Sequence, residues 1–134
     1  MILRLVRGIP GSGKSTWAKK MFSSIILEND MWCMQDDKYN FDAELHGERI
    51  KACYGTVELC LDDGMDVVVC NTFVKLEYME DYIDLAEQFD AELKVYKVIG
   101  DFGSVHDVPD EIIQKMKDEW EDFVGEKVID LTGR

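Results

Sequence analysis

The sequence predicts an α/β fold, in which helices cover a parallel β-sheet. Short apolar runs with strand character alternate along the chain with longer segments whose apolar residues recur at helical spacing. One apolar run, residues 67–70, is continuous, as in a strand that is buried on both faces. The chain has 134 residues, an ordinary size for one domain, so we expect a single domain over residues 1–134.

The first half of the chain contains two predicted strands and two predicted helices. Residues 2–6 predict the first strand, and residues 15–22 predict a helix because their apolar side chains lie at near-helical spacing. Residues 25–28 predict a second, short strand, and residues 43–62 predict a long helix. The apolar face of this long helix holds Ile50, Cys53, Val57 and Leu61.

The second half of the chain continues this alternation. Residues 67–70 predict a third strand, and residues 76–89 predict a helix because their apolar side chains have a helical period. Residues 93–99 predict a fourth strand. Residues 109–123 predict a helix that opens on proline, which suits a first helical position. The ending at 127–131 is compatible with an additional edge strand.

The most specific motif lies between the first strand and the first helix, and it is a phosphate-binding loop. Gly8, Gly13, Lys14 and Ser15 fit the spacing G-x-x-x-x-G-K-[ST]. The glycines let the backbone point N–H groups at an anion, Lys14 adds positive charge, and Ser15 offers a hydroxyl to Mg²⁺. The predicted nucleotide contacts are Gly8, Pro10, Gly11, Ser12, Gly13, Lys14, Ser15 and Thr16.

The motif predicts binding of a nucleoside triphosphate with Mg²⁺. No N-K-x-D motif for guanine is present, which favours ATP over GTP. The net charge is −13, and yet residues 1–20 hold five cations and no acid. Because nucleic-acid affinity depends on phosphate neutralisation, long RNA or DNA is a disfavoured partner, whereas a single strand end entering a local pocket remains open.

The composition also constrains the compartment. Cys33, Cys53, Cys60 and Cys70 form no C-x-x-C pair and have no histidine at zinc spacing, so we expect reduced thiols. The chain has no apolar run long enough to span a bilayer, and its early apolar stretch is too short for a signal peptide. These features predict a cytoplasmic protein without a membrane partner.

The predicted site lies at one edge of the sheet. Ligands of open parallel sheets bind beyond the carboxyl ends of the strands. This rule brings together the phosphate loop, Asp30, Asn71, Thr72 and the loop after Ile99.

The chain resembles P-loop kinases of the polynucleotide kinase and zeta-toxin kind, and more closely small, often bacteriophage-encoded, AAA-family ATP-binding proteins of that clan. The resemblance covers nearly the whole length and runs through RGIPGSGKSTWAKK, LENDMW, YNF, DVVVCNTF and the stretch from FGSVHDVP to MKDEW. It implies a three-layer P-loop NTPase fold of the kinase-like type with strand order 2-3-1-4. A bacteriophage origin would place the protein in the host cytoplasm.

The resemblance also implies roles for Asp30 and His106. Asp30 matches the carboxylate that accepts the proton of the acceptor hydroxyl, and with Ser15 it is the predicted metal ligand; its alternative role is a helix cap or turn acid. His106 is the candidate from the lid, the segment that closes over the donor; its alternative role is a cap or a surface residue. Lys75 is a second candidate cation because it lies just past Asn71 and Thr72. The predicted catalytic residues are Lys14, Asp30, Lys75 and His106.

Three departures from the family pattern stand out. The buried strand ends in Cys70-Asn71, where such enzymes usually hold an acid for the magnesium shell. Cys33 replaces an arginine that follows the base, and no cation lies between Lys97 and Lys115, where the lid arginines are expected.

Other candidates are less specific. His46 and Arg49 are expected to be solvated, and Tyr39 and Phe41 either form a wall of an acceptor pocket or belong to the core.

Two functions are compatible with these observations. The first is an ATP-dependent phosphotransferase acting on a hydroxyl of a small molecule, nucleotide or nucleic-acid end. The second is a non-catalytic ATP-binding regulatory module or weak NTPase, favoured by the absent acid and arginines.

Overall fold

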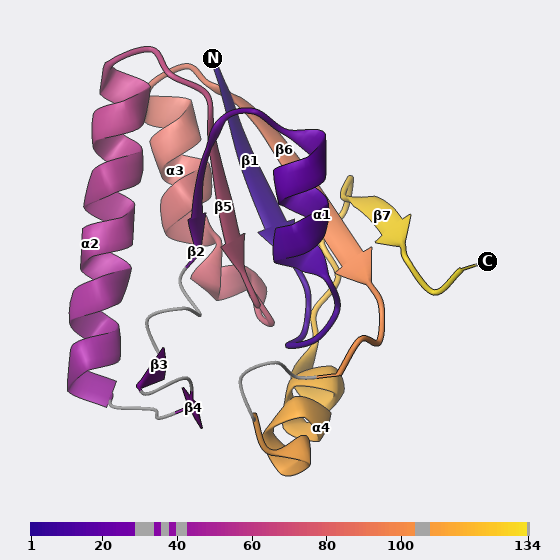
Figure 1. Ribbon diagram of the computed structural model, residues 1–134. Coiled ribbons are helices and arrows are strands. Elements are labelled where there is room, and N and C mark those ends of the chain that lie inside the picture. The colour runs from indigo at the N-terminus through magenta and orange to yellow at the C-terminus, as the bar shows by residue number, and fades with distance from the viewer. Residues whose placement is uncertain (29–33, 36–37, 40–42, 104–107, 134) are drawn as a thin grey trace.

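The protein is built around a parallel sheet with helices on both faces (Figure 1). The computed structural model describes residues 1–28, 34–35, 38–39, 43–103 and 108–133. Within these residues the sheet has five strands in the order β2-β5-β1-β6-β7, all parallel. The strands are β1 (Ile2–Arg7), β2 (Ile25–Glu28), β5 (Val67–Asn71), β6 (Glu92–Ile99) and β7 (Lys127–Asp130). The predicted order 2-3-1-4 and the additional edge strand are confirmed.

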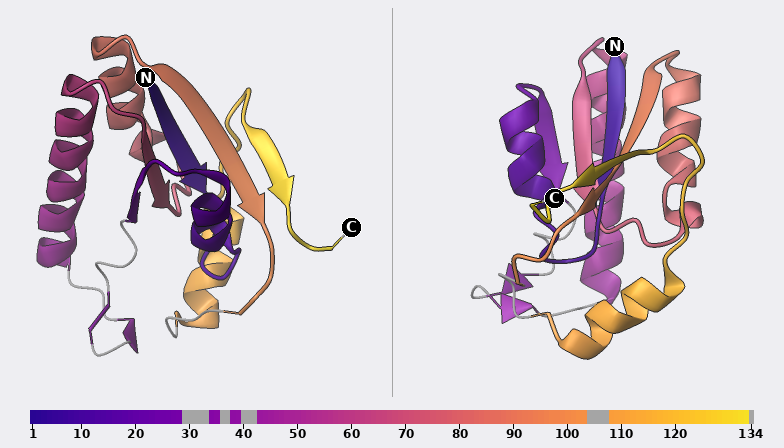
Figure 2. Two further views of the ribbon diagram at one scale, coloured as in Figure 1. Left: turned by 45° about the horizontal axis from the view of Figure 1, so that its top comes forward. Right: turned by 90° about the vertical axis from the view of Figure 1, so that its right-hand side faces the viewer.

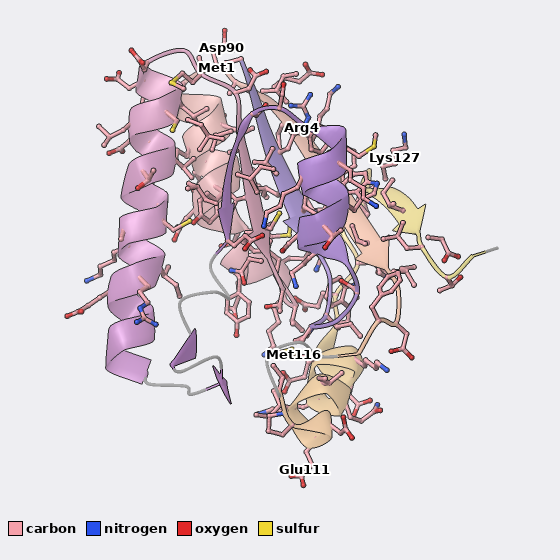
Figure 3. The ribbon with its side chains drawn as sticks, in the orientation of Figure 1. Met1, Arg4, Asp90, Glu111, Met116 and Lys127 are labelled. Carbon is pink, nitrogen blue, oxygen red and sulfur yellow. The ribbon has the colours of Figure 1, made fainter. Side chains whose placement is uncertain are left out.

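The helices lie in three positions relative to the sheet. Helix α1 (Lys14–Met21) covers one face, and α2 (Ala43–Asp62) and α3 (Glu80–Gln88) cover the other (Figure 2). Helix α4 (Asp110–Glu119) lies beyond the carboxyl ends of the strands. Its apolar side chains are at most half-buried, and none is fully buried. Met116 lies on the side of α4 toward the sheet, and Glu111 lies on the opposite side (Figure 3).

Alternate residues of the strands form two cores because successive side chains of a strand point to opposite faces. Leu3 and Leu5 belong to the core under α2 and α3. Val6, Cys70 and Val98 belong to the smaller core that Ala18 of α1 closes. On α2 the buried residues are Cys53, Val57, Cys60 and Leu61.

Four details differ from the sequence-based expectation. Ile50 is 39 % exposed, and the first residue of α2 described as buried is Cys53. The helix expected at 76–89 is divided into the 3₁₀ turn η2 (Leu76–Tyr78) and α3, with Met79 between them. The last helix ends at Glu119 rather than near Phe123, since Trp120 has an extended backbone and packs against Arg7.

The fourth difference is a small antiparallel hairpin in the segment expected to be a loop. It consists of β3 (Met34–Gln35) and β4 (Lys38–Tyr39). Strands of two residues are too short to show an alternating pattern in the sequence. Among the described residues, no helix is both long and apolar enough to cross a bilayer.

Candidate nucleotide-binding site

The phosphate loop has the backbone conformation that its glycines predict. Gly11 and Gly13 have φ of 82° and 87°, the left-handed region that side chains with a Cβ rarely adopt. The Ser12 N–H donates a hydrogen bond of 3.2 Å to the carbonyl oxygen of Ile9, which closes the turn. Gly8 leaves no room for a side chain, since a Cβ there would lie 2.5 Å from Ser12 Oγ and 2.9 Å from the Val98 carbonyl oxygen.

The N-terminus of α1 is prepared for an anion. Its N-cap residue, Gly13, provides no side-chain hydrogen bond, and the first turn contains no acidic residue. The first turns of α3 and α4, in contrast, each contain two acids. Backbone N–H groups at a helix N-terminus need acceptors, and the helix dipole favours negative charge there. Lys14, which is only 5 % exposed, adds a cation at the same point.

These features fit the phosphates of a nucleotide. The left-handed glycines, the uncapped helix and the buried lysine all favour a polyanion. Ser15 occupies the second position of α1, where its hydroxyl suits Mg²⁺ as an oxygen ligand.

The segment after β6 is fastened to the phosphate loop. The Phe102 N–H donates a 2.9 Å hydrogen bond to the Gly11 carbonyl oxygen. A Cβ on Gly100 would lie 2.3 Å from the carbonyl oxygen of Ser12, so these two backbones are in close contact. A Cβ on Gly13 would lie 2.9 Å from the ring of Phe102, which therefore covers the outer side of the loop. Gly100 thus belongs to the wall of the loop.

The end of β5 lies beside the phosphate loop, as the sheet rule predicts. Asn71 pairs with Arg7, the residue before Gly8. The side-chain oxygen of Asn71 accepts a 2.7 Å hydrogen bond from the Thr72 N–H, which leaves its amide group as a donor. Cys70, in the position expected for an acid, is fully buried toward α1.

The side chain of Arg7 is buried in the protein, although Arg7 is one of the five cations of residues 1–20. Its side chain is fully buried, and its Nη1 lies 3.0 Å from Glu126 Oε1. Its Nε and Nη2 donate to the Phe73 carbonyl oxygen, and Nη2 also donates 2.7 Å to that of Glu121. The ring of Trp120 covers the guanidinium at 4.2 Å. Burial lowers the pKa of Arg7, and the bond to Glu126 opposes this effect.

A cavity of about 290 Å³ separates the start of the phosphate loop from α4. It is lined by Gly8, Ile9, Lys97, Val98, Ile99, Gly100, Lys117 and Trp120. Lys97 Nζ lies 2.9 Å from Asp122 Oδ1, and this hydrogen bond lowers the pKa of Asp122. In the sequence, no lid cation lies between Lys97 and Lys115. In the structure, Lys97 and Lys117 both line this cavity, one from each side of that interval.

The other predicted site residues are placed as follows. Lys75 is half-buried at the N-cap of η2, four residues after Asn71. Arg49 is half-buried on α2 rather than fully solvated. Asp30, Cys33, Phe41 and His106 lie outside the described residues, as do the side chains of Tyr39 and His46. Cys53, Cys60 and Cys70 are buried, and within the described residues none of them forms a disulfide bond.

The strand order and the phosphate loop together define a P-loop fold of the kinase-like type. A family model described as "AAA domain" (AAA_33) matches residues 3–101. The chain therefore belongs to this family. No curated protein is significantly similar in sequence.

Solved structures share the fold at low sequence identity. A sugar kinase from Janibacter sp. matches with a TM-score of 0.64 and 17 % identity, over 98 % of this chain and 85 % of that one. A gluconokinase from Sinorhizobium meliloti matches with a TM-score of 0.66 and 17 % identity, over 99 % and 84 %. Kti12 from Chaetomium thermophilum, in complex with ADP-AlF3, matches with a TM-score of 0.65 and 12 % identity, over 98 % and 89 %.

Proposed function

We propose that this protein is an ATP-dependent phosphotransferase that moves the γ-phosphate to a hydroxyl of a small molecule, nucleotide or nucleic-acid end. The observation that carries the proposal is the uncapped N-terminus of α1, which follows two left-handed glycines and begins with a buried lysine. Membership of the AAA domain family and the fold shared with sugar kinase and gluconokinase structures support it.

Each site residue has a proposed role. Lys14 and the loop N–H groups bind the outer phosphates, and Ser15 binds Mg²⁺, which offsets charge on the phosphates when it is bound. Asp30, two residues after the end of β2, orients and deprotonates the acceptor hydroxyl and contributes to the metal shell. His106 and Lys75 provide charge when the lid closes on the donor.

The test is a transfer assay with γ-labelled ATP and Mg²⁺ against pooled nucleosides, nucleotides, oligonucleotide ends and metabolites. We expect label to move onto one pool, and Lys14→Ala to abolish transfer because the phosphates lose their cation. Asp30→Asn should lower turnover by about 10²-fold or more and leave ATP affinity in EDTA unchanged, since the carboxylate acts on the acceptor and the metal shell and not on the phosphates. Full transfer by Asp30→Asn would exclude Asp30 as the base.

A second candidate function is a non-catalytic ATP-binding regulatory module or a weak NTPase. The buried Cys70, the next-to-last residue of β5, favours it, because a P-loop enzyme usually holds a carboxylate there. This module would bind ATP tightly through Lys14, release free phosphate slowly if at all, and be indifferent to Asp30→Asn. The same assay therefore separates the two functions.

A further inference from the structure

We propose that Glu28 supplies the magnesium-shell carboxylate that the end of β5 lacks. The proposal rests on nucleotide binding, which both candidate functions share. Glu28 is the last residue of β2 and lies in register with Cys70 on the adjacent strand β5. Side chains in register on neighbouring parallel strands point to the same face of the sheet. The carboxylate therefore lies beside the position where an acid is expected, one strand further from the phosphate loop.

The carboxylate of Glu28 is mostly buried, and one of its oxygens accepts no hydrogen bond from the described residues. Its side chain is 17 % exposed, and Oε1 is buried without a hydrogen-bond donor among the described residues. The contact of this oxygen is an ion pair of 3.4 Å with Lys19 Nζ, whose own side chain is 63 % exposed. A buried carboxylate oxygen without a donor is unfavourable, so it favours a further positively charged or protic ligand.

The ion pair also connects Glu28 to the metal position. Lys19 lies four residues after Ser15, on the same side of α1, because side chains at i and i+4 of a helix are neighbours. Ser15 carries the hydroxyl that suits Mg²⁺. Since Mg²⁺ keeps several of its waters, a carboxylate that pairs with the next turn of α1 would act by accepting hydrogen bonds from metal-bound water.

The longer side chain explains how the residue compensates. Neighbouring strands are about 4.8 Å apart, and a glutamate reaches one methylene further than an aspartate. The additional methylene covers only part of this displacement, so Glu28 would act through metal-bound water and not as a direct ligand. Cys70 then packs with Ala18 in the smaller core.

The test measures metal affinity directly. Mn²⁺ is titrated into the wild-type protein saturated with ADP, and free Mn²⁺ is followed by electron paramagnetic resonance. We expect Glu28→Gln to weaken Mn²⁺ binding about tenfold, as for loss of an outer-shell carboxylate. ADP affinity in EDTA, measured by calorimetry, should stay unchanged.

Lys19→Met is the matched control, because it breaks the same ion pair and keeps the carboxylate. We expect Mn²⁺ affinity in this variant to equal or exceed that of the wild type. The double variant Glu28→Gln/Cys70→Asp should regain most of the lost affinity by returning an acid to the end of β5.

Three results would overturn the assignment. Equal loss of Mn²⁺ affinity in Glu28→Gln and Lys19→Met would make Glu28 a structural partner of α1 only. Unchanged affinity in Glu28→Gln would remove it from the metal shell. Absence of ADP binding by the EDTA-treated wild-type protein would contradict nucleotide binding itself, and with it both proposals.

Discussion

Arg7 holds Phe73 in a left-handed backbone conformation. Phe73 is fully buried, has φ of 44°, and accepts hydrogen bonds from both Nε and Nη2 of Arg7 through its carbonyl oxygen. A bulky residue in this conformation is strained and persists only where its surroundings fix it. Because Arg7 directly precedes Gly8, the residue that fixes the turn after β5 is also the last residue before the phosphate loop.

Arg7→Met should destabilise the fold by about 3–5 kcal/mol, the cost of breaking a buried ion pair by removing one partner. The variant would leave Glu126, whose side chain is 6 % exposed, without its cation. It would also leave the carbonyl oxygens of Phe73 and Glu121 without their donor. Urea denaturation followed by circular dichroism measures the change.

The double variant Arg7→Met/Glu126→Gln is the control for this prediction. It removes the unpaired carboxylate, so it should be more stable than Arg7→Met alone. A loss below about 1 kcal/mol in Arg7→Met, the range of an exposed ion pair, would contradict the structural role of Arg7.

Gly100→Ala should weaken nucleotide binding because the new Cβ would overlap the carbonyl oxygen of Ser12, at 2.3 Å. Overpacking of this kind costs about 1–3 kcal/mol, and here the strain falls on the phosphate loop. We therefore expect ADP affinity, measured by calorimetry, to fall about tenfold or more.

Gly55→Ala provides the comparison, since its Cβ would meet nothing within 4 Å on α2. It should raise the free energy of unfolding by about 0.5–1 kcal/mol through helix propensity and leave ADP affinity unchanged. Equal ADP affinity in Gly100→Ala and the wild type would mean that the loop after β6 does not set the geometry of the phosphate loop.

The local patterns of the sequence were sufficient to predict the sheet and the phosphate loop. The apolar run 67–70 and the motif ending at Lys14 and Ser15 each carry their information within a few neighbouring residues. Strand order required the family resemblance, because periodicity says nothing about which strands are adjacent. The sheet order observed agrees with it.

The contacts around Arg7 could not be predicted in this way. Its partners Phe73 and Glu126 are 66 and 119 residues away in the sequence. Nothing near Arg7 distinguishes a buried structural cation from one that binds phosphate. The pairing of Glu28 with Cys70 depends likewise on strand register, which becomes visible only when the sheet is formed.

Asp122 should titrate below its ordinary pKa of 3.8 in the folded protein, because the hydrogen bond from Lys97 and its charge favour the carboxylate. A depressed folded-state pKa contributes stability above the unfolded pKa, and this contribution is lost as the pH falls below 3.8. Carboxyl ¹³C NMR measures the value. Lys97→Gln should return the pKa of Asp122 toward 3.8, and an unchanged pKa in that variant would exclude Lys97 as the cause.

Lys117→Gln should lower phosphotransfer more than Lys115→Gln. Both lysines are exposed on α4, but only Lys117 lines the cavity beside Gly8 and Ile9. A cation near the transferring phosphate stabilises charge that develops in the transition state. Lid cations of this kind are worth about 10³-fold or more in rate. Since Lys117 is solvated, we expect a smaller fall in kcat, about tenfold, and less than a twofold change in Lys115→Gln. The measurement is kcat with γ-labelled ATP and the acceptor found in the transfer assay. Equal kcat values in the two variants would mean that α4 contributes no specific charge, and the lid would then depend on His106 and Lys75.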